Sequence, residues 1–216
     1  MPWFYWVGKL IARMLFLLLT HRRVRGRECV PGEGPVIIVA NHMNLADIPL
    51  LVISLGRIAI FMAKKELFYS RIAGYFLRRL GSFAVHRGQL DRKALRQAMQ
   101  VLANGSALVV FPEGMRSKNA QLRPAFSGPA LIAVRSGAPL LPVGITGTEK
   151  IKGMAWILQR PEVTVNVGHP FYLPPINGRL TRAELAERTN SIMQHIAVLL
   201  PPEYQGSYAK GIERKT

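Results

Sequence analysis

A histidine and a carboxylate stand five residues apart, directly after the hydrophobic run 36–40: they are His42 and Asp47. Histidine is the side chain best suited to take a proton near neutral pH, and a carboxylate can orient it and stabilise the imidazolium. Because residues five apart on a regular helix point about 140° from each other, the pair can meet only if His42 lies in a loop and Asp47 opens the next helix. The sequence therefore predicts an oriented general base. Two other interpretations stay open, a helix N-cap for Asp47 and an ordinary loop histidine for His42.

A second polar cluster follows the hydrophobic run 107–110 and contains Glu113, Gly114 and Arg116. The planar guanidinium of arginine can donate two hydrogen bonds at once, which suits a phosphate. In open α/β sheets, binding sites gather beyond the carboxyl ends of the strands. We therefore expect the two clusters to converge and to combine a base with a cationic site for an anionic substrate. The alternative is a plain turn after a strand.

Residues 41–47 read Asn-His-Met-Asn-Leu-Ala-Asp, and residues 111–117 read Phe-Pro-Glu-Gly-Met-Arg-Ser. Together they resemble the motifs of the glycerolipid acyltransferases, the His-x4-Asp family typified by lysophosphatidic acid acyltransferase. Weaker similarity, in the family's order, extends to residues 62–67, 81–87 and 138–145. The resemblance covers about residues 25–170, and the common order of the blocks makes a chance match improbable.

The resemblance implies a role for each matching residue. His42 is the general base that deprotonates an acceptor hydroxyl, and Asp47 orients it. Arg87 and Arg116 hold the phosphate of the acceptor, with Lys64 as a weaker candidate. The other substrate-site residues that the resemblance implies are Gly81, Glu113, Gly114 and Pro142. The oxyanion stabiliser is not visible in the sequence.

The implied reaction moves a fatty acyl group from an acyl thioester to the free hydroxyl of lysophosphatidic acid, giving phosphatidic acid. The donor is acyl-coenzyme A or acyl carrier protein, and the sequence does not distinguish them. No covalent acyl-enzyme, bound cofactor or metal is expected. Two alternatives stay open: the same chemistry on another lysophospholipid or on glycerol 3-phosphate, and a non-catalytic protein that binds membrane surfaces.

The composition agrees with a lipid-directed protein. The 216 residues are 49% hydrophobic, which suits one domain with a substantial core, and the single cysteine, Cys29, excludes an internal disulfide. The net charge of +17 predicts attraction to polyanions. The sequence has no zinc-finger spacing, no aromatic RNA-binding motif and no clear recognition helix, so we expect membrane lipid and anionic substrate rather than nucleic acid. Of the remaining histidines, only His86 beside Arg87 is of interest.

Residues 3–20 are strongly apolar but carry Lys9 and Arg13, which share one helical face. A helix of this length spans about 27 Å, and a charge in the bilayer centre costs about 2.5–3.5 kcal/mol. We therefore expect a helix that lies in the membrane interface. A single tilted span and a helix buried on its own domain are the alternatives. The basic residues of 21–27 favour the cytoplasmic face and anionic lipid.

Strand-like and helix-like runs alternate along the rest of the chain. The strands are expected at 35–40, 82–86, 106–111, 139–145 and 162–168, and the helices at 47–56, 70–80, 90–103, 127–136 and 181–199. This alternation predicts an α/β fold, with a mixed, largely parallel central sheet flanked by helices.

The predicted division of the chain has three parts. They are a membrane-interface helix with its basic segment over 1–27, an acyltransferase domain over 28–200, and a loosely held tail over 201–216. Residues 146–160 are expected to form a surface loop with a few core anchors, and a second membrane contact is the less favoured interpretation.

Overall fold

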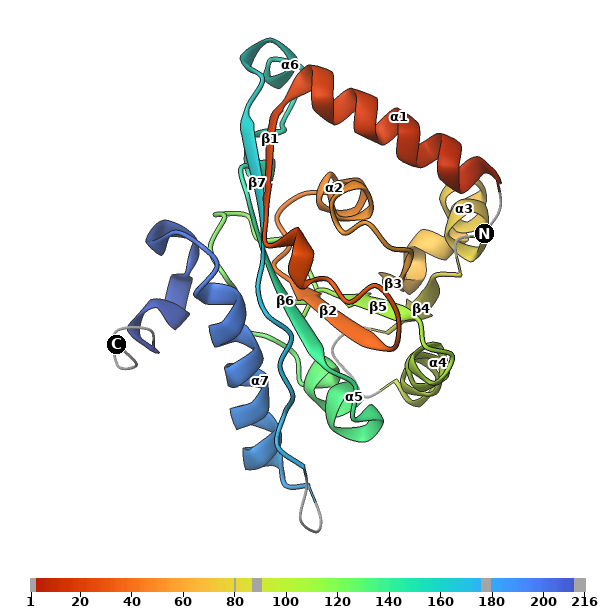
Figure 1. The fold of residues 1–216 in the computed structure, drawn as a ribbon, viewed down its shortest axis with the longest axis vertical. Helices are drawn as coiled ribbons and strands as arrows, with labels where there is room; N and C mark the ends of the chain where they lie inside the picture. The colour runs from red at the N-terminus through yellow and green to blue at the C-terminus, as the bar shows by residue number, and fades with distance from the viewer. Residues whose placement is uncertain (1–2, 80, 87–90, 176–179, 212–216) are drawn as a thin grey trace.

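The computed structural model describes residues 3–79, 81–86, 91–175 and 180–211. Its central feature is a seven-stranded sheet with the strand order β1-β7-β6-β2-β5-β3-β4 (Figure 1). The strands are β1 (His21–Arg25), β2 (Val36–Ala40), β3 (Ala59–Lys64), β4 (Phe83–Val85), β5 (Ala107–Val110), β6 (Leu140–Thr146) and β7 (Glu162–Val167). All neighbouring strands pair in parallel except β6 and β7, which are antiparallel. The predicted mixed, largely parallel sheet is confirmed.

Seven α-helices occur in the described residues. They are α1 (Trp3–Leu19), α2 (Asp47–Ser54), α3 (Arg71–Arg79), α4 (Arg92–Ala103), α5 (Gly128–Ser136), α6 (Trp156–Gln159) and α7 (Arg182–Ala197). Short 3-10 helices cover Arg27–Cys29 (η1), Lys65–Tyr69 (η2), Thr148–Lys150 (η3), Pro202–Tyr204 (η4) and Gly206–Gly211 (η5). Side chains start two of the longer helices, since Asp91 caps α4 and Thr181 forms a capping box with Glu184 at α7.

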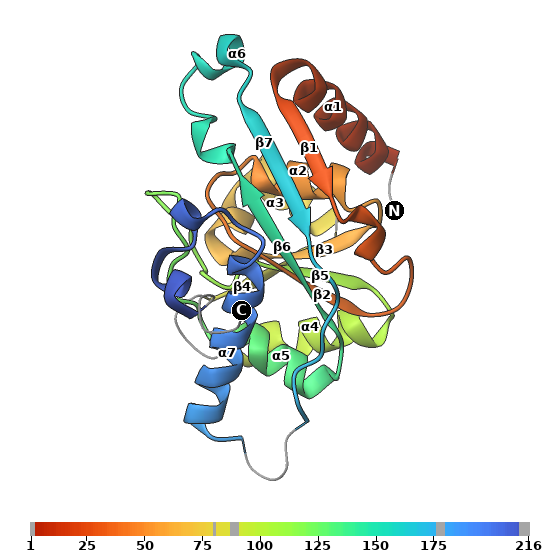
Figure 2. The same ribbon diagram turned by 60° about the vertical axis from the view of Figure 1, so that its left-hand side comes forward.

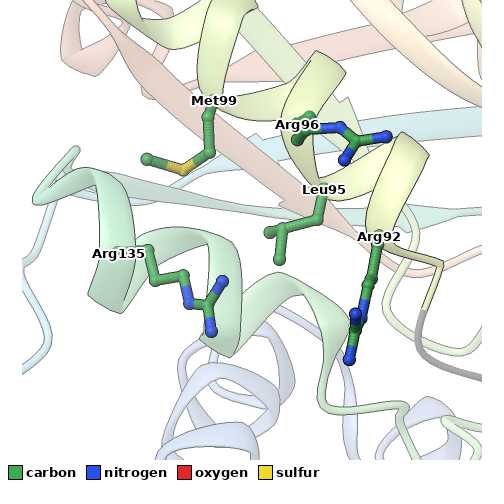
Figure 3. A pocket seen from close by; sticks show the side chains of 5 residues that line it. All are labelled: Arg92, Leu95, Arg96, Met99 and Arg135. Carbon is green, nitrogen blue, oxygen red and sulfur yellow. The ribbon is translucent and has the colours of Figure 1, made fainter.

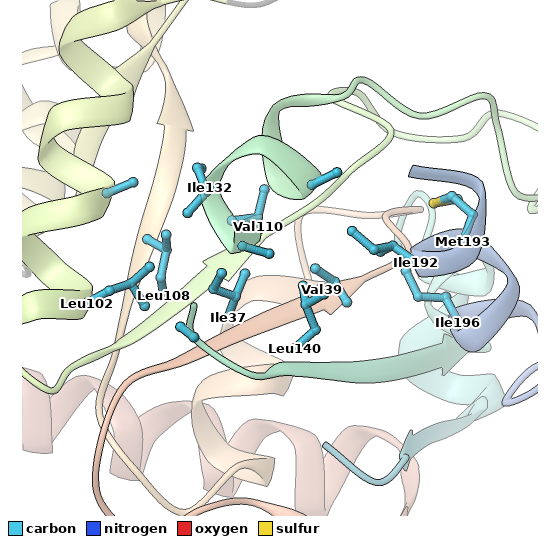
Figure 4. Close-up of a cluster of buried hydrophobic side chains, with 14 of the residues drawn as sticks. Ile37, Val39, Leu102, Leu108, Val110, Ile132, Leu140, Ile192, Met193 and Ile196 are labelled. Atoms are coloured by element: carbon cyan, nitrogen blue, oxygen red, sulfur yellow. The ribbon is translucent and has the colours of Figure 1, made fainter. Parts of the chain in front are cut away.

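The helices cover both faces of the sheet (Figures 1 and 2). On one face, α4, α5 and α7 pack on alternate strand residues such as Ile37 and Val39 (Figure 4). On the other face, α1 and α2 pack with the intervening residues Val36, Ile38 and Ala40. Because both faces are covered, β2 is a continuous apolar run rather than an alternating one, as is typical of parallel sheets.

The strand register brings several loops to one edge of the sheet. Val39 of β2 pairs with Val110 of β5 and with Pro142 of β6. On the far side of β5, Phe61 of β3 pairs with Val109, and β4 runs parallel to β3. The carboxyl ends of β2, β3, β4, β5 and β6 therefore meet at the same edge, which we call the active-site edge. Both polar clusters of the sequence follow strands that end there.

Two strands were not predicted from the sequence. The basic segment 21–25 forms β1, an edge strand whose residues are alternately exposed and half-buried, and 59–64 forms β3. The prediction of a loosely held tail is wrong for its first part, because Tyr204 and Gln205 bond to the domain. The Tyr204 carbonyl accepts the Leu122 N–H at 2.8 Å, and Gln205 Nε2 donates to the Leu200 carbonyl at 2.8 Å. The division of the chain at 27 and 200 otherwise stays a prediction.

The N-terminal apolar segment is a helix, as predicted. A narrow stripe of α1, including Tyr5 and Phe16, is buried, and α1 lies over α2 (Figure 1). Most of its other apolar side chains are exposed, among them Trp3, Trp6 and Leu10. Among the described residues, no helix combines the length and the apolar character needed to cross a bilayer.

Candidate active site

His42 lies in the loop after β2, and Asp47 is the first residue of α2. The chain folds back between them, so that His42 Nδ1 lies 2.7 Å from Asp47 Oδ2. The two side chains are 8% and 0% exposed. Pro49 occupies the first turn of α2, where the missing N–H does no harm. The predicted geometry, a loop histidine met by the carboxylate that opens the next helix, is confirmed.

The Asp47 carboxylate holds the loop rather than the helix. Its Oδ2 also accepts the N–H groups of Met43 and Asn44, at 2.7 and 2.8 Å. The residue in the N-cap position is Ala46, so the N-cap interpretation of Asp47 is wrong. Because a carboxylate only accepts hydrogen bonds, the His42 Nδ1 carries the proton between them and Nε2 is left to accept one.

Glu113 joins the two polar clusters. Its Oε1 accepts the His42 N–H at 2.9 Å, and its Oε2 accepts the Arg123 N–H at 3.0 Å. Burial raises the pKa of Glu113 to about 7, although both N–H bonds and the Arg123 charge oppose the shift. Both carboxylate oxygens are used within the protein. Glu113 therefore acts as a positioning residue between the loops after β2 and β5.

Further contacts fix the imidazole from neighbouring strands. The Phe111 ring stacks on His42, with ring centroids 4.2 Å apart and planes 20° apart. The Asn41 side chain donates to the Ile145 carbonyl at 2.8 Å and accepts the Ile145 N–H at 2.7 Å. Residues on β6 and after β5 thus hold the loop that follows β2. Sequence reasoning assigned no role to Asn41 or Phe111, although both flank the predicted clusters.

Gly114 makes the turn between Glu113 and Arg116. It has φ +67°, and a Cβ at this position would lie 2.6 Å from the Phe126 ring. Only glycine fits both the backbone conformation and the space. The Ser117 N–H donates to the His42 carbonyl at 2.7 Å, so the residue next to Arg116 is bonded to the histidine loop. Arg116 is exposed, and within the described part of the chain it makes no hydrogen bond or ion pair.

Among the described residues, the other predicted substrate residues make no hydrogen bond or ion pair with this cluster. Lys64 ends β3 at the active-site edge and lies 3.2 Å from Glu66, both exposed. Gly81, with φ +75°, makes the turn before β4, and Pro142 is buried within β6 beside Val39. Arg87 lies outside the described residues.

A pocket of about 470 Å³ lies between α4 and α5 (Figure 3). It is lined by Arg92, Leu95, Arg96, Met99 and Arg135. None of these is a predicted site residue, so the candidate active site is defined by the His42 cluster and not by this pocket. Among the described residues, no three His, Cys, Asp or Glu side chains gather as metal ligands would.

Comparisons with known proteins identify the family to which the chain is similar. The model of a family described as Acyltransferase matches residues 21–146, which include both polar clusters. The chain is 30% identical to the chloroplastic 1-acyl-sn-glycerol-3-phosphate acyltransferase BAT2 of Brassica napus, over 78% of this chain and 50% of that protein. It is 29% identical to the 1-acyl-sn-glycerol-3-phosphate acyltransferase of Streptococcus pneumoniae, over 77% of this chain and 62% of that protein.

A solved structure is also similar. It is the crystal structure of the 1-acyl-sn-glycerophosphate (LPA) acyltransferase PlsC from Thermotoga maritima, with a TM-score of 0.67 and 27% identity. The match covers 97% of this chain and 78% of that chain. The α/β fold is therefore shared over nearly the whole chain described above.

Proposed function

The chain belongs to the acyltransferase family, and from that premise we propose that it moves a fatty acyl group from a thioester to the free hydroxyl of lysophosphatidic acid, giving phosphatidic acid. One observation carries the proposal: the buried Asp47 carboxylate bonds to the His42 imidazole, and the His42 backbone carbonyl accepts the N–H of Ser117. Ser117 follows Arg116, whose exposed side chain makes no ion pair among the described residues. This arrangement supplies a base beside an anion site. The names of the relatives from Brassica napus and Streptococcus pneumoniae support the same acceptor.

In the proposed mechanism, His42 Nε2 removes the proton of the acceptor hydroxyl while the oxygen bonds to the thioester carbonyl carbon. The carbon–sulfur bond then breaks, and the proton passes from the imidazolium to the leaving thiolate. Asp47 stabilises the imidazolium between these steps. A positioned general base contributes about 10²-fold to 10⁴-fold in rate. No acyl group is bonded to the protein at any stage.

The acceptor's phosphate is proposed to bind the guanidinium of Arg116, with Lys64 farther along the same edge. The role of Arg87 rests on the sequence motif alone. Gly114 makes the turn that precedes Arg116, and the roles of Gly81 and Pro142 in the acceptor site rest on the sequence motif alone. A phosphate held on arginine positions the hydroxyl before the proton moves, which lowers the entropic barrier to attack.

We assign the exposed apolar side of α1 to the membrane interface. The side chains of Trp3, Trp6 and Leu10 are exposed. Lys9 and Arg13 share one face of the helix, from which they can reach the lipid headgroups. The net charge of +17 favours the anionic cytoplasmic leaflet and the anionic carriers of the acyl donor, coenzyme A or acyl carrier protein.

A labelled-acyl transfer assay tests the proposal. The acceptors are lysophosphatidic acid, glycerol 3-phosphate and monoacylglycerol, each with acyl-coenzyme A and with acyl carrier protein. We expect lysophosphatidic acid to be acylated fastest. Arg116→Ala should lower kcat/KM for this acceptor by about tenfold or more, because it removes a charged hydrogen bond, and should leave the donor KM unchanged.

Lys118→Ala is the matched control, since Lys118 is an exposed cation on the same loop. It should leave kcat/KM unchanged for every acceptor. Equal losses in Arg116→Ala for acceptors with and without phosphate would contradict the phosphate site. Absence of transfer to any of the acceptors in the parent protein would contradict the proposed activity itself.

A further inference from the structure

The segment between η3 and β7 ends in an exposed apolar tip. Met154, just before the single turn of α6, is 81% exposed, and Leu158, within that turn, is 91% exposed. Only Ile151, near the start of the segment, packs against the second core cluster. The segment is a surface loop with one core contact, and Met154 and Leu158 are among the most exposed large hydrophobic residues described.

This tip stands at the active-site edge. The segment leaves β6 where β6 ends, and Asn44 of the histidine loop donates through Nδ2 to the Ile151 carbonyl at 2.9 Å. At its other end, Arg160 Nη2 donates to the Leu17 carbonyl of α1 at 3.3 Å. Figures 1 and 2 show α6 beside the end of α1 that leads into β1.

The apolar tip continues the exposed apolar surface of α1. Leu17 and Leu18, at the end of α1 next to Arg160, are both exposed. The two surfaces come from segments more than a hundred residues apart in the sequence, and the segment that carries the tip is also bonded to the histidine loop through Asn44. A flat apolar partner that covers the exposed side of α1 can therefore also contact the tip that carries Met154 and Leu158.

The charge of residues 150–160 indicates that the surface they bind is anionic. Residues 150–160 contain Lys150, Lys152 and Arg160, all exposed, and no acidic residue. The acidic residues on either side are engaged elsewhere. Glu149 accepts the Tyr204 hydroxyl at 2.8 Å, and Glu162 pairs with Arg23 at 3.3 Å. Exposed large apolar side chains flanked by cations are typical of surfaces that insert shallowly into anionic bilayers.

We infer that residues 150–160 form a second membrane-insertion element, in which Met154 and Leu158 enter the surface of an anionic bilayer beside α1. A single interfacial helix leaves the domain free to rotate about the helix axis. A second insertion point, tied to the histidine loop through Asn44, removes this freedom and turns the active-site edge toward the lipid. The inference goes beyond the proposed function and rests on it only in assuming that the acceptor is drawn from the bilayer.

The test uses the full chain and vesicles of phosphatidylglycerol and phosphatidylcholine in equal amounts. The variant is Met154→Ser with Leu158→Ser, and binding is measured by co-sedimentation. We expect the vesicle partition coefficient to fall by about tenfold or more, because the apolar transfer contributed by two large side chains is lost. Vesicles of phosphatidylcholine alone should bind the parent protein more weakly.

The matched control is Tyr172→Ser with Val198→Ser, which removes two exposed apolar side chains that do not belong to this segment. It should partition like the parent protein. Equal partitioning of the Met154/Leu158 variant and the parent would overturn the inference. So would a parent dimer in vesicle-free solution that the variant dissociates, because the tip would then be covered by a second copy.

Acyl transfer to a short-chain acceptor without vesicles separates this inference from the proposed function. The Met154/Leu158 variant should keep the parent rate there and lose rate only with acceptor presented in vesicles. A parent protein without activity on the soluble acceptor would count against the proposed function, while the vesicle-binding result would stand by itself.

Discussion

Two histidine–aspartate pairs in this chain share a sequence spacing and a similar contact, yet their surroundings differ. His42 Nδ1 lies 2.7 Å from Asp47 Oδ2, and His86 Nδ1 lies 2.9 Å from Asp91 Oδ2. Each pair follows the carboxyl end of a parallel strand, β2 or β4, and each aspartate stands at the start of a helix, α2 or α4. In both pairs the contact is made because the histidine lies in the loop and the aspartate, five residues later, stands at the start of the helix.

The other partners of the two carboxylates differ. Asp47 directs Oδ2 to loop N–H groups that precede it and leaves α2 without a side-chain cap. Asp91 directs Oδ1 to the N–H groups of Lys93 and Ala94, both at 3.0 Å, and so caps α4. Although burial opposes the shift, these bonds and those from His86 hold the pKa of Asp91 well below its usual range.

The two imidazoles also differ in how firmly they are held. The His42 side chain is 8% exposed and stacks on Phe111, whereas the His86 side chain is 46% exposed. The backbone N–H of His42 is also bonded to Glu113. Preorganisation by neighbouring strands, and not the histidine–aspartate contact itself, thus separates a candidate base from a helix cap with an attached histidine.

The largest expected effect separates the two histidines directly. His42→Ala should lower kcat for acyl transfer by about 10²-fold to 10⁴-fold, because the general base is removed. His86→Ala is the matched control and should stay within about twofold of the parent, as expected for an exposed side chain away from the proton transfer. The measurement is steady-state acylation of lysophosphatidic acid. Similar losses of kcat in both variants would contradict the assignment of His42, and not His86, as the base.

The second-largest expected effect concerns Glu113, which bonds to the backbone of His42. Glu113→Gln keeps the volume but leaves the N–H of His42 or Arg123 without an acceptor, which costs about 1–3 kcal/mol in the free energy of unfolding. We expect kcat to fall as well, since the histidine loop loosens. Urea denaturation measures the stability, and Glu203→Gln, on an exposed carboxylate, is the control.

This difference in stability should depend on pH. The pKa of Glu113 is raised from 4.5 to about 7 in the folded protein, so the folded state binds the proton more tightly than the unfolded state does. As pH rises through this interval, the parent protein should lose stability relative to Glu113→Gln. A stability difference that is constant across the interval would contradict the buried, raised-pKa carboxyl.

The smallest expected effect concerns Asp91, in the pair with His86. Asp91→Ala removes the cap of α4 and should cost about 1 kcal/mol in the free energy of unfolding while leaving acyl transfer unchanged. Asp91→Asn should recover most of that stability, because asparagine also caps helices well. Thermal denaturation and the acylation assay measure the two quantities. Loss of activity in both variants would assign the second pair a role in the reaction.

Local sequence patterns predicted that the two polar clusters meet. The polar clusters after 36–40 and 107–110 were expected to converge because parallel strands end at one edge, and the Glu113 bonds to both loops confirm that they do. The bond between Asn41 and Ile145 could not be predicted, because it joins residues 104 apart through the neighbouring position of β2 and β6. Strand adjacency is a property of the whole sheet and leaves no local signal.

The sequence was less informative at the edges of the fold. β1 resembles a basic segment because an edge strand buries little: its residues are alternately exposed and half-buried, and only Val24 is apolar. The role of Asp47 was ambiguous between a cap and an orienting group, because both place a carboxylate at the start of a helix. The assignment of Arg87 to the phosphate stays a prediction.

A crystal structure of the complex with lysophosphatidic acid, without donor, would show whether His42 and Arg116 act on one acceptor molecule. The measured quantity is the distance from the acceptor's free hydroxyl oxygen to the nearest histidine nitrogen. We expect this distance to be about 2.6–3.2 Å to His42 Nε2, with the phosphate on Arg116. A hydroxyl beyond hydrogen-bond reach of His42, or one that lies beside His86, would contradict it.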